Sequence, residues 1–595
     1  MTEQTTYSLS GWSLADLFPK GDEAEIKSAL DHLEMKIKDF ENRRADLSAA
    51  ISIETFMELV KQLEQISKEG NILYSFAGLW FASNTQNQAA QTLLARIQQF
   101  SAEMTNRTLF FSLWWKALDD SNAQRLMDAA GDYRYWLEEM RHFKKHTLSE
   151  PEEKIINIKD VTGFSAFTTL YDSITNRYIF KVKIGSKTKS LTRDSLMVYA
   201  RHFNPDYRAA AYRELYRVYG KDGNILGQIY QTIVRDWRNE QVTLRGFASP
   251  IAARNLVNDV PDDVVDTLLD VCQANAPVFQ RFFQLKARWL GMERLRRYDI
   301  YAPVAQSNKK YAFNQSLRLV LDSFSSFDPL LAQMVERVLK ANHLDSEIRK
   351  GKRSGAFCWS VNPGMTPWVL VNYQGRVDDV ETLAHEMGHA IHSMLAEHHT
   401  AYTYHASLPM AETASTFGEM LLVDKLLQDE PDESVRRDIL FRQVDDAYAT
   451  ILRQAFFARY ERTAHDLVNQ GAAVDDLSAA YLDNLKLQFG DAVEVSDEFR
   501  WEWVSIPHLF HVPFYVYAYS FGQLLVMALY QQYKKEGEAF KPRYFKILST
   551  GGADAPVRIL SNAGIDVHQP AFWQGGFDVL RELVEELERL PLPQK

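Results

Sequence analysis

The segment TLAHEMGHAIHSML, at residues 382–395, carries the pattern His-Glu-x-x-His together with a helical spacing of apolar side chains. On a helix, His385 and His389 lie one turn apart and about 40° apart around the axis, so both imidazoles point the same way. That arrangement suits two ligands of one zinc ion. Glu386 lies about 100° round from His385, where its carboxylate can reach a metal-bound water and act as a general base. Chance occurrence in a long chain is the alternative explanation.

The ends and the interior of this predicted helix carry further information. Asp378 or Asp379 is expected to cap its start, and Glu381 suits its first turn. Gly388 lies inside it, where glycine costs about 1 kcal/mol relative to alanine. We therefore expect a strand or a second helix to pack closely against Gly388.

A catalytic zinc ion takes three protein ligands and keeps one position open, so a third ligand must come from elsewhere. The segment Ser407–Leu422 (SLPMAETASTFGEMLL) predicts a second helix, capped by Ser407 with Pro409 in its first turn. On it, Glu412 and Glu419 are seven residues apart and share one face. Coordination by Glu412, with Glu419 hydrogen-bonded to a metal ligand, explains both carboxylates. Simple solvation of the two side chains is the alternative.

His392 competes with Glu412 for the third ligand position. It lies two turns beyond His385 on the same face, a span of about 10 Å. Because that span is too long for one ion to bridge, we expect His392 to form a hydrogen bond behind the ligands, or to serve packing.

Most of the remaining chain predicts helices, and two places predict strands. Apolar residues recur at helical spacing in the N-terminal region up to about residue 150, so this region predicts antiparallel helices. Residues 178–191 alternate and turn at Gly185-Ser186, as a hairpin does. Residues 356–373 contain two short apolar runs on either side of a turn. An edge strand there would hold a peptide by backbone hydrogen bonds, which predicts substrate contacts at Ala356, Phe357, Cys358 and Trp359.

The length and composition of the chain restrict its domain number, its partners and its location. The chain has 595 residues, too many for one typical domain. A composition shift near residues 190–205 predicts an N-terminal helical lobe at about 1–195 and a catalytic domain at 196–595. A net charge of −11 argues against a nucleic-acid partner. With two cysteines, no signal-peptide pattern and no long apolar run, we expect a cytoplasmic protein without membrane contact.

Several blocks resemble the oligoendopeptidase F and thimet oligopeptidase group of zinc peptidases. The main ones are HEMGHAIHS at 385–393 and AETASTFGE at 411–419. Supporting similarity lies in GKRSGAFCW at 351–359, LVNYQGRVDDVETLAHE at 370–386, YDIYAP at 298–303 and WVSIPHLFHVPFYVYAYSFGQ at 503–523. The resemblance is best over residues 200–590.

The resemblance implies a mainly α, two-lobed fold with a deep substrate channel and a small β-sheet beside the zinc-binding helix. It implies one Zn²⁺ per chain and endopeptidase action on short, unfolded peptides. It assigns His385, His389 and Glu412 as ligands and Glu386 as the general base, the same roles that the spacing suggests.

The same group carries a histidine and tyrosines near the C-terminus that polarise the scissile carbonyl. In the matching stretch we interpret His508 and Tyr519 as stabilising the transition state, with Tyr515 near the substrate. An aromatic core stripe is the alternative for each tyrosine. Tyr517 falls on the opposite side of a helix, and Pro513 is expected to interrupt it and leave His508 in a preceding loop. The chain has no glycine between His508 and Gly522, unlike the thimet branch.

The sequence therefore predicts a zinc-dependent endopeptidase that hydrolyses internal bonds of short oligopeptides. A zinc carboxypeptidase or other exopeptidase is the first alternative, with Arg353 or Arg376 to hold the terminal carboxylate. A catalytically weak peptide-binding protein and a metal-free helical scaffold are the others.

Overall fold

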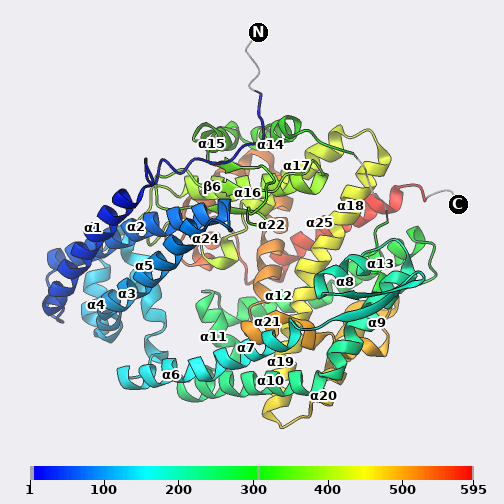
Figure 1. The fold of residues 1–595 in the computed structure, drawn as a ribbon, viewed down its shortest axis with the longest axis horizontal. Coiled ribbons are helices and arrows are strands. Elements are labelled where there is room, and N and C mark those ends of the chain that lie inside the picture. The colour runs from blue at the N-terminus through cyan, green and yellow to red at the C-terminus, as the bar shows by residue number, and fades with distance from the viewer. Residues whose placement is uncertain (1–5, 305–308, 593–595) are drawn as a thin grey trace. The chain divides into compact units, whose positions relative to one another are not determined.

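A computed structural model of the protein describes residues 6–304 and 309–592, and the fold is mainly α, as predicted (Figure 1). Contacts divide the chain into two compact units. The first comprises Met1–Lys144, Asn308–Asp429 and Tyr533–Ile565, and the second comprises Lys145–Ser307, Glu430–Gln532 and Asp566–Lys595. This division differs from the boundary expected near residue 195, because each unit is assembled from three separate stretches of chain.

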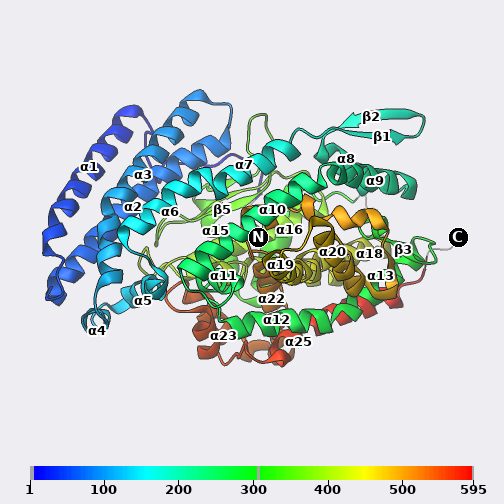
Figure 2. The same cartoon turned by 90° about the horizontal axis from the view of Figure 1, so that it is seen from below.

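The first unit begins with a group of long helices that lie side by side in both views (Figures 1 and 2). Their bounds are α1 (Glu23–Asn42), α2 (Ile53–Ser83) and α3 (Gln88–Ala117), followed by the shorter α4 (Asp120–Met127) and α5 (Arg134–His142). Asp22 and Ser52 accept hydrogen bonds from backbone N–H groups at the starts of α1 and α2, so they act as the caps. The face of α1 that the apolar spacing predicted is buried, through Ile26, Leu33, Ile37 and Phe40.

A small three-stranded sheet lies in the same unit. Its strands are β4 (Leu344–Asp345), β5 (Phe357–Trp359) and β6 (Trp368–Leu370), in the order β4-β6-β5. β5 runs antiparallel to β6, and β4 runs parallel to it. The two short apolar runs expected within residues 356–373 are therefore strands, and β5 is an edge strand of this sheet.

The sheet packs against α16 (Val377–Leu395), which in turn packs against α17 (Ser415–Asp429). A Cβ atom on Gly388 would lie 2.5 Å from Ser415 Cα and 2.6 Å from Ala414 O. The expected close neighbour of Gly388 is thus the backbone that leads into α17. The remaining helices of this unit are α14 (Phe313–Phe327), α15 (Pro329–Lys340), α23 (Lys541–Ser549) and α24 (Pro556–Asn562).

Two predicted helix starts were wrong. The residue that caps α16 is Arg376, not Asp378 or Asp379, and the Asp379 carboxylate accepts the Arg376 N–H at 2.8 Å from the third position of the helix. The second helix does not begin after Ser407: residues 408–410 form a 3₁₀ turn, and α17 begins only at Ser415. The intervening backbone passes against Gly388, which leaves Glu412 in a turn rather than on a helix.

The second unit contains the hairpin β1 (Phe180–Ile184) and β2 (Lys187–Leu191), as predicted for residues 178–191. In Figure 2 the hairpin lies beside α8 and α9, and α25 runs along α12. A short parallel pair joins β3 (Leu295–Arg296) to β7 (Val493–Glu494). The helices are α6 (Glu150–Thr162), α7 (Phe164–Thr175), α8 (Arg193–Ala200), α9 (Pro205–Lys221), α10 (Gly223–Trp237), α11 (Pro250–Val257), α12 (Asp262–Ala274), α13 (Ala276–Trp289), α18 (Glu433–Ala447), α19 (Arg453–Asn469), α20 (Val474–Phe489), α21 (Pro507–His511), most of α22 (Tyr517–Glu536) and α25 (Pro570–Arg589).

The long helices of the protein are amphipathic rather than uniformly apolar. Within the described residues, none combines the length and the hydropathy that a bilayer-spanning helix requires.

Candidate metal centre

Three side chains in the first unit bring metal-binding atoms together. His385 and His389 come from successive turns of α16, and Glu412 comes from the turn before α17. The Nε2 atoms of the two histidines lie 3.1 Å apart. Glu412 Oε2 lies 3.3 Å from His385 Nε2 and 3.4 Å from His389 Nε2. All three donor atoms lie within 4.8 Å of one another.

Neighbouring side chains fix the orientation of two of these groups. Glu419, on α17, accepts a hydrogen bond from His385 Nδ1 at 2.5 Å. In the neutral imidazole, that bond keeps the proton on Nδ1 and leaves the Nε2 lone pair of His385 directed at the other donor atoms. Ser415 Oγ donates to Glu412 Oε2 at 2.7 Å. The two glutamates act near the same histidine although they do not share a helix face, because the turn brings Glu412 back beside α16.

The pKa shifts of these groups have identifiable causes. Burial alone lowers the pKa of His385, but the hydrogen bond to Glu419 and the carboxylates nearby outweigh it and raise the pKa to about 9. Burial is the largest effect on His389 and lowers its pKa to about 4, although the Glu412 carboxylate acts in the opposite direction. Burial raises the pKa of Glu386 to about 7, against the opposing effect of His385. The charges of His385, Glu412 and Glu419 therefore all act on the pKa of Glu386.

The donor set fits a divalent metal ion. Two imidazole nitrogens face each other at hydrogen-bond distance with a carboxylate oxygen beside both. Two nitrogens and one oxygen on three side chains is a common ligand set of catalytic zinc, and such a set leaves a coordination position for water or substrate. The bond from His385 Nδ1 to Glu419 is the carboxylate–histidine contact that usually accompanies such a ligand.

His385, Glu386 and His389 line a pocket of about 560 Å³. Its lining includes the residues at 356–360, His385, Glu386, His389, His392, Ser393, Tyr404, His405, Ala406 and Ala411. The edge strand β5 therefore borders the same pocket as the histidines, and Glu386 is only 7% exposed beside it. The predicted substrate residues Ala356, Phe357, Cys358 and Trp359 all line this pocket.

His392 is buried close to the backbone of Ala411, and burial lowers its pKa to about 4. It lines the pocket with its neighbours but does not belong to the group of convergent donor atoms among the described residues. Its predicted role in hydrogen bonding stays a prediction.

The sequence did not indicate Tyr404 and His405, which also line the pocket. They lie in a segment without a periodic pattern, and a distant glycine positions them. Gly552 donates its N–H to Thr403 O at 2.8 Å, and a Cβ atom on it would lie 2.1 Å from His405 O. Only the tertiary fold brings that glycine to this segment, so no local signal could have identified these residues.

The predicted C-terminal residues form a cluster of their own in the second unit. Tyr519 OH and His508 Nε2 lie 3.3 Å apart, and the Tyr515 ring centroid is 5.3 Å from that of Tyr519. Tyr517 is buried on the other side, where its hydroxyl accepts from Asn258 Nδ2 at 2.9 Å. His508 lies in the short helix α21 rather than in a loop, which corrects the expectation based on Pro513. Pro513 instead lies in the turn between α21 and α22.

The arginines considered for an exopeptidase lie outside the metal pocket's lining. The Arg353 guanidinium stacks over the Phe357 ring at 5.3 Å, and Arg376 pairs with Asp378 at 3.3 Å.

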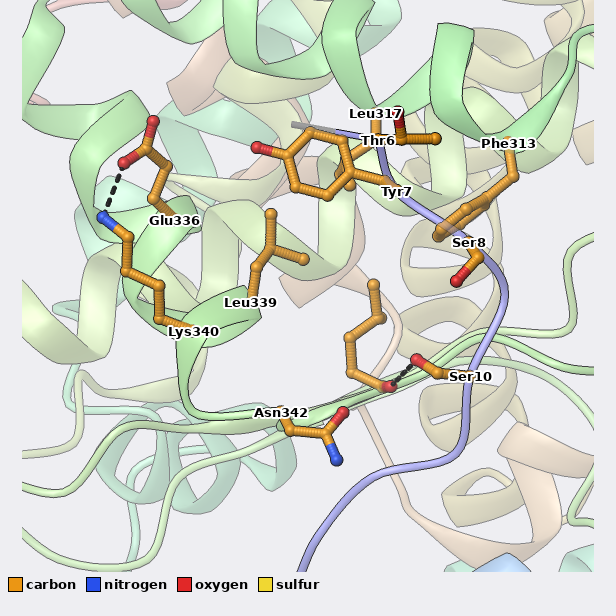
Figure 3. A pocket seen from close by; sticks show the side chains of 11 residues that line it. Thr6, Tyr7, Ser8, Ser10, Phe313, Leu317, Glu336, Leu339, Lys340 and Asn342 are labelled. Atoms are coloured by element: carbon orange, nitrogen blue, oxygen red, sulfur yellow. Dashed lines mark hydrogen bonds and ion pairs between the residues drawn. The ribbon is translucent and has the colours of Figure 1, made fainter. Parts of the chain in front are cut away.

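A separate pocket of about 510 Å³ lies between residues 6–10 and helices α14 and α15 (Figure 3). The rings of Tyr7 and Phe313 line it, and so do Glu336 and Lys340, which form an ion pair at 2.9 Å (Figure 3). Among the residues that the structure describes, those that line this second pocket include no histidine or cysteine, the donors that distinguish the metal pocket.

The model of peptidase family M3 matches residues 198–579, and the model described as Oligopeptidase F matches residues 114–180. The chain belongs to peptidase family M3. This M3 peptidase is 27% identical over 597 residues to Oligopeptidase PepF of Bacillus subtilis, a match that covers 98% of this chain and 88% of the relative. It is 26% identical over 594 residues to the Oligoendopeptidase F homolog of Borreliella burgdorferi, covering 97% and 98% of the two chains.

Solved structures show the same fold for the M3 peptidase. A structure from Chlamydophila abortus matches with a TM-score of 0.90 at 24% identity, covering 97% of both chains. Oligoendopeptidase-F from Enterococcus faecium matches with a TM-score of 0.70 at 23% identity, covering 95% of this chain and 98% of that one. The resemblance drawn from the sequence blocks and the mainly helical fold are therefore confirmed.

Proposed function

We propose that this M3 peptidase is a zinc-dependent endopeptidase that hydrolyses internal bonds of short, unfolded oligopeptides. The convergence of His385, His389 and Glu412 beside a buried Glu386 carries the proposal. The names of its relatives, Oligopeptidase PepF and Oligoendopeptidase F, support the substrate class.

His385, His389 and Glu412 would hold one zinc ion, with Glu419 orienting His385. A zinc ion bound there supplies Lewis-acid chemistry, because it lowers the pKa of water and polarises a carbonyl.

Glu386 is assigned as the general base. Its carboxyl group is buried in the metal pocket, and burial holds its pKa near the operating pH of an enzyme, at about 7. Such a group accepts a proton from the attacking water and returns it to the leaving amine. Because burial excludes bulk water, the proton is retained between these two steps.

The β5 edge strand is assigned to substrate binding. Its residues 357–359 border the pocket, and their backbone can align an extended peptide as an added strand. A short unfolded peptide supplies such a strand without having to unfold, which explains a preference for oligopeptides.

His508 and Tyr519 are assigned to the developing negative charge on the carbonyl oxygen, with Tyr515 beside the substrate. The two side chains form a polar pair at 3.3 Å in which both carry N–H or O–H donors. Burial lowers the pKa of His508, so the imidazole is neutral at pH 7 and donates through one nitrogen only.

A reducing, cytoplasmic location belongs to the same proposal. Cys272 and Cys358 are both free thiols, and Cys358 lines the metal pocket.

The decisive experiment uses an internally quenched peptide of about ten residues, blocked at both ends. Cleavage that a chelator abolishes and zinc restores is the expected result. An exopeptidase cannot cleave a doubly blocked peptide, so absence of cleavage with one zinc still bound per chain would favour that alternative. Absence of both cleavage and zinc would refute the metal site.

Glu386→Gln tests the base separately from the metal. The amide keeps the shape of the side chain but cannot accept a proton, so we expect normal zinc content and loss of nearly all turnover. Near wild-type turnover in this variant would contradict the role of Glu386.

A further inference from the structure

The turn between α21 and α22, residues 512–516, contains a strained residue. Phe514 has a φ of 57°, in the left-handed region. The other described non-glycine residues with positive φ are Asp259 and Asn342, types that adopt this conformation readily. A phenylalanine does not, so other contacts must hold the turn in place.

Two buried side chains supply those contacts. Glu461, on α19, accepts the Phe514 N–H at 2.8 Å, and its side chain is 1% exposed. Arg254, on α11, donates through Nε to Pro513 O at 3.1 Å. The turn is thus held at two successive residues, from two different helices. The ring of His465, one turn beyond Glu461 on α19, packs on the Phe514 ring with centroids 4.5 Å apart.

Glu461 lies in an environment that disfavours a carboxyl group. Its second oxygen, Oε2, is buried without a hydrogen-bond partner among the described residues. Burial raises its pKa to about 8, so the group is mostly uncharged at pH 7. Burying a polar group with one atom unpaired costs free energy. Packing alone does not account for an acid at this position, whereas the bond to the strained residue does.

The turn sets the positions of the two tyrosines, Tyr515 and Tyr519, that lie beside His508. Tyr515 follows Phe514 directly, and its N–H closes the turn on Val512 O at 3.2 Å. The Tyr519 N–H donates to Val516 O at 3.2 Å in the first turn of α22. Displacement of Phe514 therefore moves Tyr515 at once and Tyr519 through the start of the helix.

We propose that Glu461 is a positioning residue for catalysis: by holding Phe514 in its left-handed conformation, it sets the positions of Tyr515 and Tyr519 relative to His508. This inference rests on the proposed role of that cluster in stabilising the transition state. Glu461 itself touches neither substrate nor metal in this scheme.

The test compares three variants of the full-length, zinc-loaded enzyme. Glu461→Leu removes the acceptor, Glu461→Gln keeps it, and Val468→Ala removes two buried methyl groups two turns further along α19 as a stability control. We expect Glu461→Leu to lower kcat by roughly 10-fold or more, with KM changed by less than about twofold, because a displaced catalytic group acts on the chemical step. Glu461→Gln should stay within about twofold of wild type in both.

A rescue experiment addresses the strain directly. Glycine adopts positive φ without cost, so Phe514→Gly introduced into Glu461→Leu should recover part of the lost kcat. No recovery, or a kcat for Glu461→Leu equal to that of Val468→Ala, would overturn the inference. If Glu461→Leu does not fold, Arg254→Leu removes the other anchor of the turn and is judged by the same criteria.

The role of the cluster is tested separately. Tyr519→Phe should lower kcat, and adding Glu461→Leu to it should lower kcat further by less than Glu461→Leu does alone, because both act through Tyr519. Fully additive losses would overturn the positioning role. If Tyr519→Phe leaves kcat unchanged, the proposed function of Tyr519 fails. The positioning role is then decided by the ¹⁹F spectrum of 3-fluorotyrosine at 519, which must shift in Glu461→Leu and not in Glu461→Gln.

Discussion

Gly388→Ala offers a quantitative test of how the candidate metal centre is assembled. The added methyl carbon would lie 2.5 Å from Ser415 Cα and 2.6 Å from Ala414 O, both backbone atoms. Carbon atoms in contact are normally about 3.5–4.0 Å apart, so the backbone before α17 must retreat by about 1 Å. Ser415 bonds to the Glu412 side chain at 2.7 Å, so the same movement carries the carboxylate away from the histidines.

We expect Gly388→Ala to reduce zinc affinity and activity much more than it reduces the stability of the fold. Overpacking costs about 1–3 kcal/mol, and alanine returns about 1 kcal/mol of helix propensity, so we expect a loss of at most about 2 kcal/mol in stability. A misplacement of about 1 Å at an active site costs up to 100-fold in activity. Gly388→Ala should therefore fold, bind zinc at least roughly 10-fold more weakly and lose most of its activity.

The assay measures the zinc dissociation constant by competition with a chelator, together with kcat and the thermal midpoint. Gly418→Ala is the matched control, because its Cβ would meet the Phe324 ring at 2.8 Å, and a side chain can move where a backbone cannot. We expect the control to keep its zinc affinity at a similar stability. Wild-type zinc affinity and activity in Gly388→Ala would refute the view that this glycine sets the distance between α16 and Glu412.

Three further predictions concern groups around the sites. Glu419→Ala should weaken zinc binding by about 10–100-fold, measured by the same competition assay, because His385 loses the carboxylate that orients it; an unchanged affinity would contradict that role. Glu461 should make the protein less stable as the pH rises from 4.5 to about 8, because the unfolded chain loses this proton at a lower pH than the folded one. Over that pH interval the free energy of unfolding falls by at most roughly 5 kcal/mol. The thermal midpoint of Glu461→Gln should therefore rise relative to that of the wild type between pH 5 and pH 8. Parallel plots of the two midpoints against pH would exclude the effect. Lys286→Met should destabilise the second unit by roughly 3 kcal/mol in denaturant titrations, because the ammonium group is fully buried against Asp445 and its removal leaves that carboxylate unpaired; a loss below about 1 kcal/mol would indicate that the pair contributes little.

Periodicity and turn residues in the sequence correctly predicted several helices and strands, because these elements depend on residues that are close along the chain. The helix at 382–395, the hairpin at 178–191 and the strands before the metal helix follow from periodicity and turn residues. Helix starts were predicted less well. Ser407 and Pro409 are typical of a helix start, yet α17 begins at Ser415. The close approach of this backbone to Gly388 competes with helix formation there, and that contact is not visible from the local sequence.

Three residues of the candidate metal centre could be placed from the sequence alone because they lie on one helix. His385, Glu386 and His389 have a relation fixed by helix geometry alone, since 3.6 residues per turn places them regardless of the rest of the protein. The sequence also supplied Glu412 and Glu419 as candidates, because carboxylates in an apolar segment require a partner. These inferences depend on distances of a few residues along the chain.

The geometry between separate elements came from the fold and could not be predicted from the sequence. The fold showed that Glu412 reaches the histidines from a turn, that Gly552 positions Tyr404 and His405, and that Glu461 holds the strained Phe514. Each of these contacts joins residues that are far apart along the chain or on different elements. The free energy that selects them comes from packing many side chains at once, and no single segment of the sequence carries that information.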